Sequence, residues 1–164
     1  MCGVKTNVVT SIEITESVRN DSTQFDSLVK RTAENFTLRE VSADKAYCSR
    51  ANMKLVSDLG GTPYIPFRRH TTSRAARVAV WHNMWYMYNL HRDEFMKHYH
   101  KRSNVETTMH MIKSKFGGRL RSKDRTGQVN ELLAKVLCHN ICVVIQEMHE
   151  MWGNVQSEEE DFHA

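Results

Sequence analysis

"LREVSADKAYCSRANMKLVSDLGGTPYIPF", residues 38–67, carries the pattern that decides the fold class. Residues 38–43 have the composition of a short β-strand, and this strand ends at Asp44. Residues 49–61 have helical periodicity and finish in two glycines, which is typical of a helix closed by glycine. Residues 62–67 predict another strand, placed near a sheet edge by its two prolines. A strand, helix, strand order indicates an α/β fold.

The residues before this stretch are predicted to extend the same alternation. Residues 7–15 alternate and are rich in β-branched side chains, which predicts a strand. Residues 3–7 read as the hairpin turn that leads into it. Asp21 or Ser22 can cap a following helix. Its apolar positions recur at helical spacing: Phe25, Leu28, Val29 and Ala33.

Beyond residue 78 the apolar period becomes helical throughout. One stripe consists of Trp81, Met84, Trp85 and Tyr88, and we expect it to lie in the core. A helix starting near Ser103 is predicted from Val105, Met109, Ile112 and Phe116. A long final helix is predicted from Leu132, Val136, Ile141 and Ile145. The C-terminal half is therefore expected to be helical.

Size and charge suggest one domain with a polyanionic partner. The chain has 164 residues, of which 40% are hydrophobic, and a formal net charge of +4. We expect one packed domain over residues 1–150 and an acidic, disordered tail over 151–164. No acidic residue occurs from Leu59 to Arg92, and basic residues also gather in Lys113–Arg125. Such clusters favour a polyanion, with solvated helix faces as the alternative.

The sequence gives no indication of a membrane protein or a disulfide-bonded one. Its most apolar window, residues 78–90, is too short to cross a bilayer, which needs roughly 20 apolar residues. No signal peptide precedes it. The four cysteines form no C-x-x-C pair and have no histidines at zinc-finger spacing. We therefore expect a cytoplasmic protein without membrane contact.

Four polar residues around the start of the helix near Ser103 form a candidate constellation: Tyr99, Arg102, Glu106 and Lys113. Glu106 and Lys113 are two helical turns apart on nearly the same line. Two ordinary roles compete for the glutamate. Ser103 and Glu106 match the S-x-x-E capping box, and Arg102 could pair with Glu106 on the surface. The combination with Asp44, a carboxylate at the end of a strand, favours a functional role.

These four residues resemble the Tyr-x2-Arg-x3-Glu-x6-Lys signature of DDE transposases from prokaryotic insertion sequences. Four segments are similar to consecutive segments of such transposases in the same order: VSADKAYCSRANM, GGTPYIPFR, YHKRSNVETTMHMIKSKFG and NELLAKVLCHNICVVI. The resemblance covers about residues 1–150. It implies an RNase H-like fold of the α/β class and a role in DNA transposition.

The resemblance also implies the roles of individual residues. It places catalytic and metal-binding carboxylates on Asp44 and Glu106. In an intact site, two Mg²⁺ or Mn²⁺ ions about 4 Å apart would serve DNA cleavage and strand transfer. Carboxylates suit these hard cations. The residues expected to bind DNA around the site are Tyr99, Arg102, Lys113, Lys115, Arg119 and Arg121.

The start of the chain departs from the family pattern. The family's first catalytic aspartate lies on a strand ahead of residues 3–7, and no residue of this sequence stands in for it. We therefore expect an RNase H-like fold truncated at its N-terminus, inactive on its own. The alternative is a non-catalytic module that binds DNA or interacts with a transposase. A homo-oligomer, or pairing with a full-length transposase, is a further expectation about partners.

Overall fold

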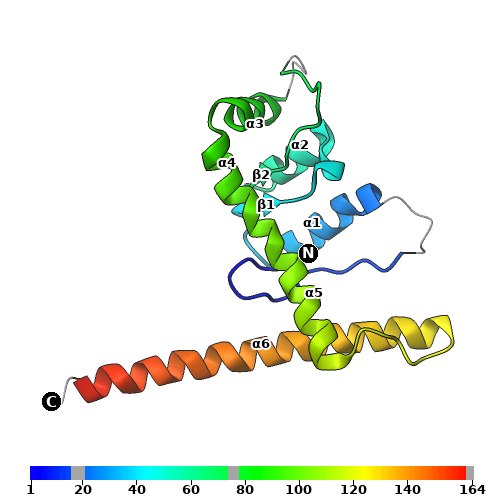
Figure 1. Cartoon of the computed structure of the whole chain (residues 1–164), viewed down its shortest axis with the longest axis vertical. Helices are drawn as coiled ribbons and strands as arrows, with labels where there is room; N and C mark the ends of the chain where they lie inside the picture. Colours follow the sequence, from blue (N-terminus) through cyan, green and yellow to red (C-terminus); the bar gives the residue numbers. More distant parts are fainter. Residues whose placement is uncertain (16–20, 74–77, 162–164) are drawn as a thin grey trace. The chain divides into compact units, whose positions relative to one another are not determined.

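The computed structural model describes residues 1–15, 21–73 and 78–161 (Figure 1). Met1 and Thr10–Ser103 form a first compact unit, and Cys2–Val9 and Asn104–Ala164 form a second. The class is mixed α/β, as the sequence predicts.

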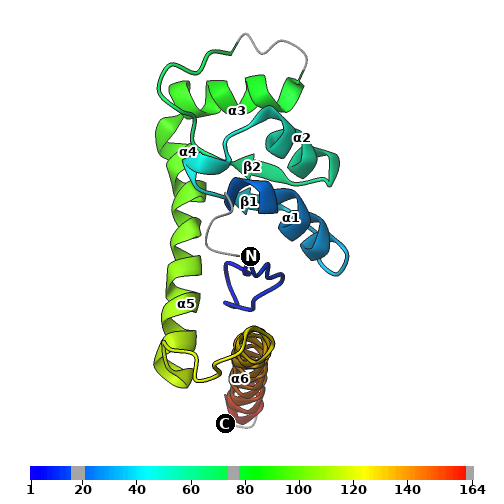
Figure 2. The ribbon, with the colours of Figure 1, turned by 90° about the vertical axis from the view of Figure 1, so that its right-hand side faces the viewer.

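The first unit contains a pair of parallel strands surrounded by helices. Its elements, in chain order, are η1 (Asp21–Gln24), α1 (Phe25–Ala33), β1 (Glu40–Ser42), η2 (Lys45–Tyr47), α2 (Arg50–Asp58), β2 (Thr62–Tyr64), α3 (Ala79–Leu90), α4 (Arg92–Tyr99) and η3 (His100–Arg102). β1 and β2 pair in parallel, with Val41 opposite Pro63. The pair lies between α2 and α4 (Figure 2). The strand, helix, strand prediction for residues 38–67 is confirmed.

Capping residues determine where α2, the helix between the two strands, begins and ends. The Ser49 hydroxyl caps its start by accepting the Asn52 backbone N–H at 3.1 Å. Gly60 ends it in a left-handed conformation with φ 83°, which glycine adopts without steric cost. Both ends are therefore set by the residue types that the sequence supplies at these positions.

The core of this unit forms where helices cover the strand pair. Met53, Val56, Ile65 and Phe95 are all 0% exposed. The other buried apolar residues of the cluster are Phe25, Val29, Leu38, Val41, Tyr64, Phe67, Trp81 and Met84. Trp85 and Tyr88 pack at its margin. The stripe predicted for residues 81–88 is therefore a core stripe.

The strand predicted at residues 7–15 does not form, and this is a correction to the sequence analysis. Within residues 1–15, the described β pairing is the single antiparallel bridge between Cys2 and Val9. The hairpin turn before it is present, with the Gly3 N–H donating to the Val8 carbonyl at 2.8 Å. At Val9, Asn140 takes the place of a neighbouring strand, because its carboxamide accepts the Val9 N–H at 2.8 Å and donates to the Val9 carbonyl at 2.9 Å. A side-chain amide thus satisfies the groups that a neighbouring strand would otherwise bind.

The second unit combines the hairpin turn with two helices. α5 (Ser103–Phe116), whose first residue belongs to the first unit, and α6 (Arg125–Asp161) confirm the predicted helices. Their buried faces match the predicted ones only in part. Ile112 of the predicted α5 stripe is buried, whereas the other buried residues, Thr108 on α5 and His139 and Val143 on α6, were not predicted. Of the predicted stripes, Val105, Met109, Ile141 and Ile145 are 43–50% exposed.

Polar anchors from the turn explain this difference in the second unit. His139, fully buried, hydrogen-bonds through Nε2 to the Asn7 carbonyl at 3.0 Å. The Thr108 hydroxyl bonds to the Asn7 side chain at 3.3 Å. Hydrogen bonds to the turn, rather than hydrophobicity alone, therefore select which helix faces are buried.

The helix α6 ends at Asp161, within the acidic tail, whose predicted disorder over residues 151–164 stays a prediction. Glutamate has a high helix propensity, which favours continuation of the helix. Within the described residues, Arg125–Met151 is also the one stretch long and apolar enough to cross a membrane, by length and composition alone. A single such helix is weak evidence for a membrane span, which the sequence did not predict.

The basic loop 117–124, between α5 and α6, is held by two side chains of α6. The Glu131 carboxylate accepts the backbone N–H groups of Arg121 and Ser122 at 2.8 and 3.0 Å. Lys135 donates to the Arg119 carbonyl at 2.8 Å and pairs with Glu131 at 3.0 Å. The N–H donor of Ser122 contributes most to lowering the pKa of Glu131 from 4.5 to about 2.

Phe95→Ala is expected to lower the free energy of unfolding by about 3–5 kcal/mol, because it leaves a cavity in the core. The Phe95 ring packs edge-on against those of Tyr64 and Tyr88. Urea denaturation followed by circular dichroism measures the change. The control is Leu90→Ala, where a side chain that is 69% exposed should matter by less than about 0.5 kcal/mol. Equal losses for the two variants would contradict this description of the core.

Protonation of Glu131 is expected to release the loop only in strong acid. Its folded pKa, about 2, lies below the ordinary value of 4.5, so its stabilising effect is present above pH 4.5 and is lost as the pH falls through about 2. The amide proton shifts of Arg121 and Ser122, followed by NMR, should titrate with a midpoint near the lower value. In Glu131→Gln this titration should disappear. A wild-type midpoint near 4.5 would show that the loop is not held in this way.

Candidate functional site

Asp44 lies two residues after β1, beyond the carboxyl end of a parallel strand. Its side chain is exposed, and its Oδ1 accepts the Ala46 backbone N–H at 3.1 Å, which caps η2. The cap fixes the direction of the carboxylate, and ligands of α/β folds commonly bind at carboxyl ends of strands. The strand end predicted for Asp44 is therefore present, whereas its catalytic role stays a prediction.

Tyr99 and Arg102 are in contact within the first unit. Tyr99 ends α4 and packs against the core, half-buried. The Arg102 guanidinium carbon lies 5.9 Å from the centroid of the Tyr99 ring, a cation–π distance. The aromatic ring therefore supports the guanidinium at the edge of the unit.

Glu40 holds the segment that carries Arg102. Its carboxylate accepts from Lys101 at 2.8 Å and bonds to His98 at 2.9 Å, so β1 is tied to the end of α4 and to η3. Burial raises the pKa of Glu40, but the hydrogen bonds from His98 and Lys101 outweigh burial and lower the pKa overall. The sequence analysis did not identify this cluster, because its members are 58 and 61 residues apart.

Glu106 and Lys113 are exposed on α5, seven positions apart and so on the same side of the helix. Ser103 does not have the extended conformation usual for a capping-box serine. Its dihedral angles are helical, and its hydroxyl donates to the His100 carbonyl at 2.9 Å. The capping-box interpretation of Glu106 is therefore disfavoured.

The remaining predicted DNA contacts are exposed cations of the second unit. Lys115 lies in the last turn of α5, and Arg119 and Arg121 lie in the loop that Glu131 and Lys135 hold. A loop with a fixed backbone loses less entropy when its side chains bind phosphate. The sequence analysis missed this support, although Glu131 and Lys135 have the i, i+4 spacing of a helical ion pair.

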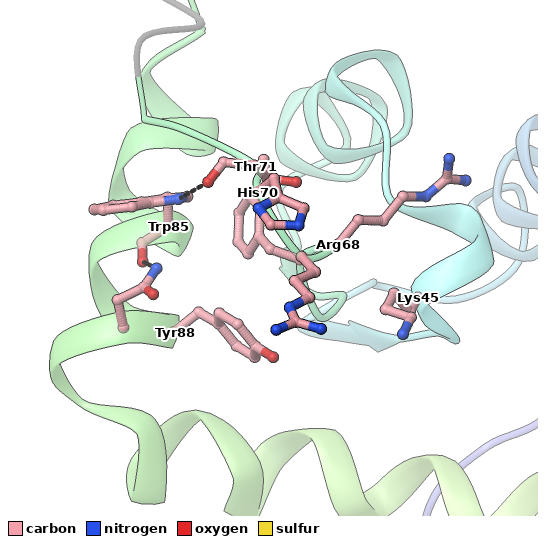
Figure 3. Close-up of a pocket in the computed structure, with 9 residues that line it drawn as sticks. Lys45, Arg68, His70, Thr71, Trp85 and Tyr88 are labelled. Carbon is pink, nitrogen blue, oxygen red and sulfur yellow. Dashed lines mark hydrogen bonds between the residues drawn. The ribbon is translucent and has the colours of Figure 1, made fainter.

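A basic pocket of about 320 Å³ adjoins the residue after Asp44 (Figure 3). Its lining is Lys45, Phe67, Arg68, Arg69, His70, Thr71, Trp85, Tyr88 and Asn89, and none of these described residues is acidic. Trp85 and Tyr88 lie on one side and Lys45 on the other. The sequence analysis noted the basic stretch and the aromatic stripe separately, but not that they meet.

The loop of this pocket is fixed by two tryptophans of α3. Trp85 donates its indole N–H to the Thr71 carbonyl at 3.0 Å, and Trp81 donates to the Thr72 carbonyl at 3.3 Å. Arg68 donates to the Ala46 carbonyl at 3.2 Å. His70 has a left-handed backbone, φ 71°, which is uncommon for a non-glycine residue. These hydrogen bonds hold residues 68–72 of the loop, where the basic residues Arg68, Arg69 and His70 are exposed.

The donor set partly fits a divalent metal. Asp44 and Glu106 supply the hard oxygen ligands that Mg²⁺ and Mn²⁺ prefer. Asp44 belongs to the first unit and Glu106 to the second, and the described ranges contain no cluster of three or more His, Cys, Asp or Glu side chains that could hold a metal. These residues by themselves do not complete a metal site.

The comparisons with known proteins identify the family. A family model described as the transposase DDE domain matches residues 1–141. No curated protein matches the chain. No solved structure matches it either. The matched segment includes Asp44, the basic pocket, and all four residues of the signature from Tyr99 to Lys113. The chain therefore belongs to the DDE transposase family.

Proposed function

We propose that this chain serves metal-dependent cleavage and transfer of DNA strands in the transposition of an insertion sequence, with Asp44 and Glu106 as catalytic carboxylates. Membership in the family implies DNA as partner, an RNase H-like fold and the use of divalent metal ions. The observation that carries the proposal is the exposed, capped position of Asp44 at the end of a parallel strand. The signature residues around Glu106 support it.

Asp44 and Glu106 would hold Mg²⁺ or Mn²⁺, two ions in an intact site. Such ions activate the attacking water or hydroxyl group and neutralise the leaving oxygen when bound. The chain's own cations would position the DNA. Arg102, supported by the Tyr99 ring, and Lys113 would contact the backbone near the reacting phosphate. A fixed cation beside developing negative charge lowers the energy of the transition state.

Two basic surfaces would bind the rest of the DNA backbone. One is the loop with Arg119 and Arg121, preceded by Lys115. The other is the pocket loop with Arg68, beside Lys45. Both loops are held by side-chain hydrogen bonds to their backbone, which favours binding of phosphate by their exposed cations.

A second candidate function is a non-catalytic module that binds DNA or pairs with a full-length transposase. The fixed basic loops favour it, because they need no metal in order to hold phosphate. Under either function we propose a cytoplasmic location. We also propose that residues 1–164 do not cut DNA on their own, because two carboxylates cannot reproduce the three of the DDE site.

Purified residues 1–164 are expected to bind duplex DNA in a salt-dependent manner, since phosphate contacts release counterions. They should not cleave it in the presence of Mg²⁺ or Mn²⁺. Gel shift and nicking of a supercoiled plasmid measure the two activities. Metal-dependent nicking that is lost in Glu106→Gln would contradict the proposed inactivity while supporting the catalytic role. Absence of DNA binding at low salt would contradict the catalytic function and the DNA-binding form of the second candidate, and would leave only pairing with a full-length transposase.

Asp44 and Glu106 are expected to share a bound ion. In NMR spectra, Mn²⁺ should broaden the amide signals next to both residues, and either Asp44→Asn or Glu106→Gln should abolish the broadening at both places. Asp58→Asn is a matched control, because this exposed carboxylate pairs with Lys54 on α2. Broadening around Asp44 that persists in Glu106→Gln would refute a shared ion.

A further inference from the structure

The end of α4 is attached to the strand pair by a polar cluster within the first unit. We call it the Glu40 cluster, and its members are Glu40, Ser42, Tyr64, His98 and Lys101. Glu40 binds His98 and Lys101, and the Ser42 hydroxyl donates to the His98 carbonyl at 3.0 Å. The His98 ring stacks on Tyr64, with centroids 4.3 Å apart and planes 6° apart. Residue 98 is therefore held through its ring, a ring nitrogen and its backbone.

Alternation along β1 explains why two of its side chains reach the end of α4. Side chains two positions apart lie on the same face of a strand, as Glu40 and Ser42 do. Val41, between them, points to the other face and is buried in the core. Asp44 follows two residues beyond Ser42. The strand that binds His98 is therefore the strand that leads to the proposed catalytic carboxylate.

The spacing of residues on α4 and η3 transmits this attachment to two residues of the signature. Phe95, His98 and Lys101 are three positions apart, and residues at this spacing lie on one side of a helix. Burial of Phe95 and the Glu40 cluster therefore fix the rotation of this segment about its axis. Tyr99 and Arg102 each follow an anchor by one position. The directions of the Tyr99 ring and of the guanidinium beside it are thereby fixed as well.

Neither stability nor charge accounts well for a carboxylate at this place. The side chains of Glu40, His98 and Lys101 are 33%, 27% and 40% exposed, and ion pairs this exposed contribute little to the free energy of unfolding. A negative charge beside cations that meet DNA would by itself weaken binding. Supporting hydrogen bonds, in contrast, are what hold functional side chains in a productive geometry.

We propose that Glu40 and His98 are positioning residues, which orient Tyr99 and Arg102 relative to the strand that leads to Asp44. The inference deepens the proposed function and rests on it, since Arg102 is proposed there to contact the DNA backbone. Glu40 and His98 act through their neighbours and need not touch DNA or metal themselves.

Glu40→Ala in the full chain tests the proposal through the sign of its effect on DNA binding. Loss of a negative charge alone should strengthen binding, whereas loss of the orientation of Arg102 should weaken it. We expect the dissociation constant for duplex DNA, measured by fluorescence anisotropy, to rise by about 5–10-fold, and the salt slope to fall by about one phosphate contact. The matched control is Glu94→Ala, which removes an exposed carboxylate of α4 outside the cluster and should not weaken binding.

Two further variants show whether the effect passes through the cluster and through Arg102. His98→Phe loses the hydrogen bond to Glu40 but keeps a ring that can stack on Tyr64, and it should also weaken DNA binding. The melting temperatures of Glu40→Ala and His98→Phe should stay close to that of the wild type. In an Arg102→Ala background, Glu40→Ala should change the affinity little, because both act on one contact. In an Arg121→Ala background its effect should be undiminished.

NMR reports the orientation without DNA. Because the Arg102 guanidinium lies over the Tyr99 ring, the ring should shift the side-chain proton signals of Arg102 upfield. This shift should shrink in Glu40→Ala and persist in Glu94→Ala.

The possible outcomes separate this proposal from the proposed function. An unchanged Arg102 shift in Glu40→Ala would overturn the positioning role, as would a gain in DNA affinity equal to that of Glu94→Ala. A large fall in the melting temperature of both cluster variants would overturn it too, because the cluster would then be structural. A lost Arg102 shift with unchanged DNA affinity would support the positioning role and contradict the proposed contact of Arg102 with DNA.

Discussion

The pairing of β1 with β2 is the constraint on which the candidate site depends. Three pairs of residues, from Glu40 with Thr62 to Ser42 with Tyr64, join the two strands in parallel. Parallel strands need a connection that crosses over, and α2 supplies it while burying Met53 and Val56. This pairing sets the strand end where Asp44 lies. The burial of Met53 and Val56 therefore helps to position the Asp44 carboxylate, which is itself exposed.

Hydrogen bonds from side chains to the backbone hold segments of the chain that the two-stranded sheet does not include. Asn140 satisfies Val9, Glu131 satisfies Arg121 and Ser122, and the indoles of Trp81 and Trp85 satisfy carbonyl groups of the basic pocket loop. Each such bond stabilises the native state modestly, and an unsatisfied buried group would cost more. The two basic loops thus owe their fixed shape to individual polar side chains.

These anchors also connect stability with function. The tryptophans belong to the core stripe and at the same time hold the loop that exposes Arg68 and His70. Glu131 lies on α6 and holds the loop that exposes Arg119 and Arg121. A substitution at such a residue would alter the shape of a basic loop without removing any of its cations. The stability of the core and the shape of the two basic loops therefore depend on the same side chains.

The sequence by itself determined the α/β class, the elements of residues 38–67, the long helices and the family, because periodicity, capping residues and the signature are local patterns. It was wrong about residues 7–15 and about part of the buried faces of α5 and α6, where Ile112 was predicted correctly and Thr108 and His139 were missed. Only the tertiary structure decided these, because Asn140 and His139 lie more than a hundred residues from the turn they bind. A local pattern shows which side chains are apolar. Burial depends on which distant polar groups find partners, and that is a property of the folded chain.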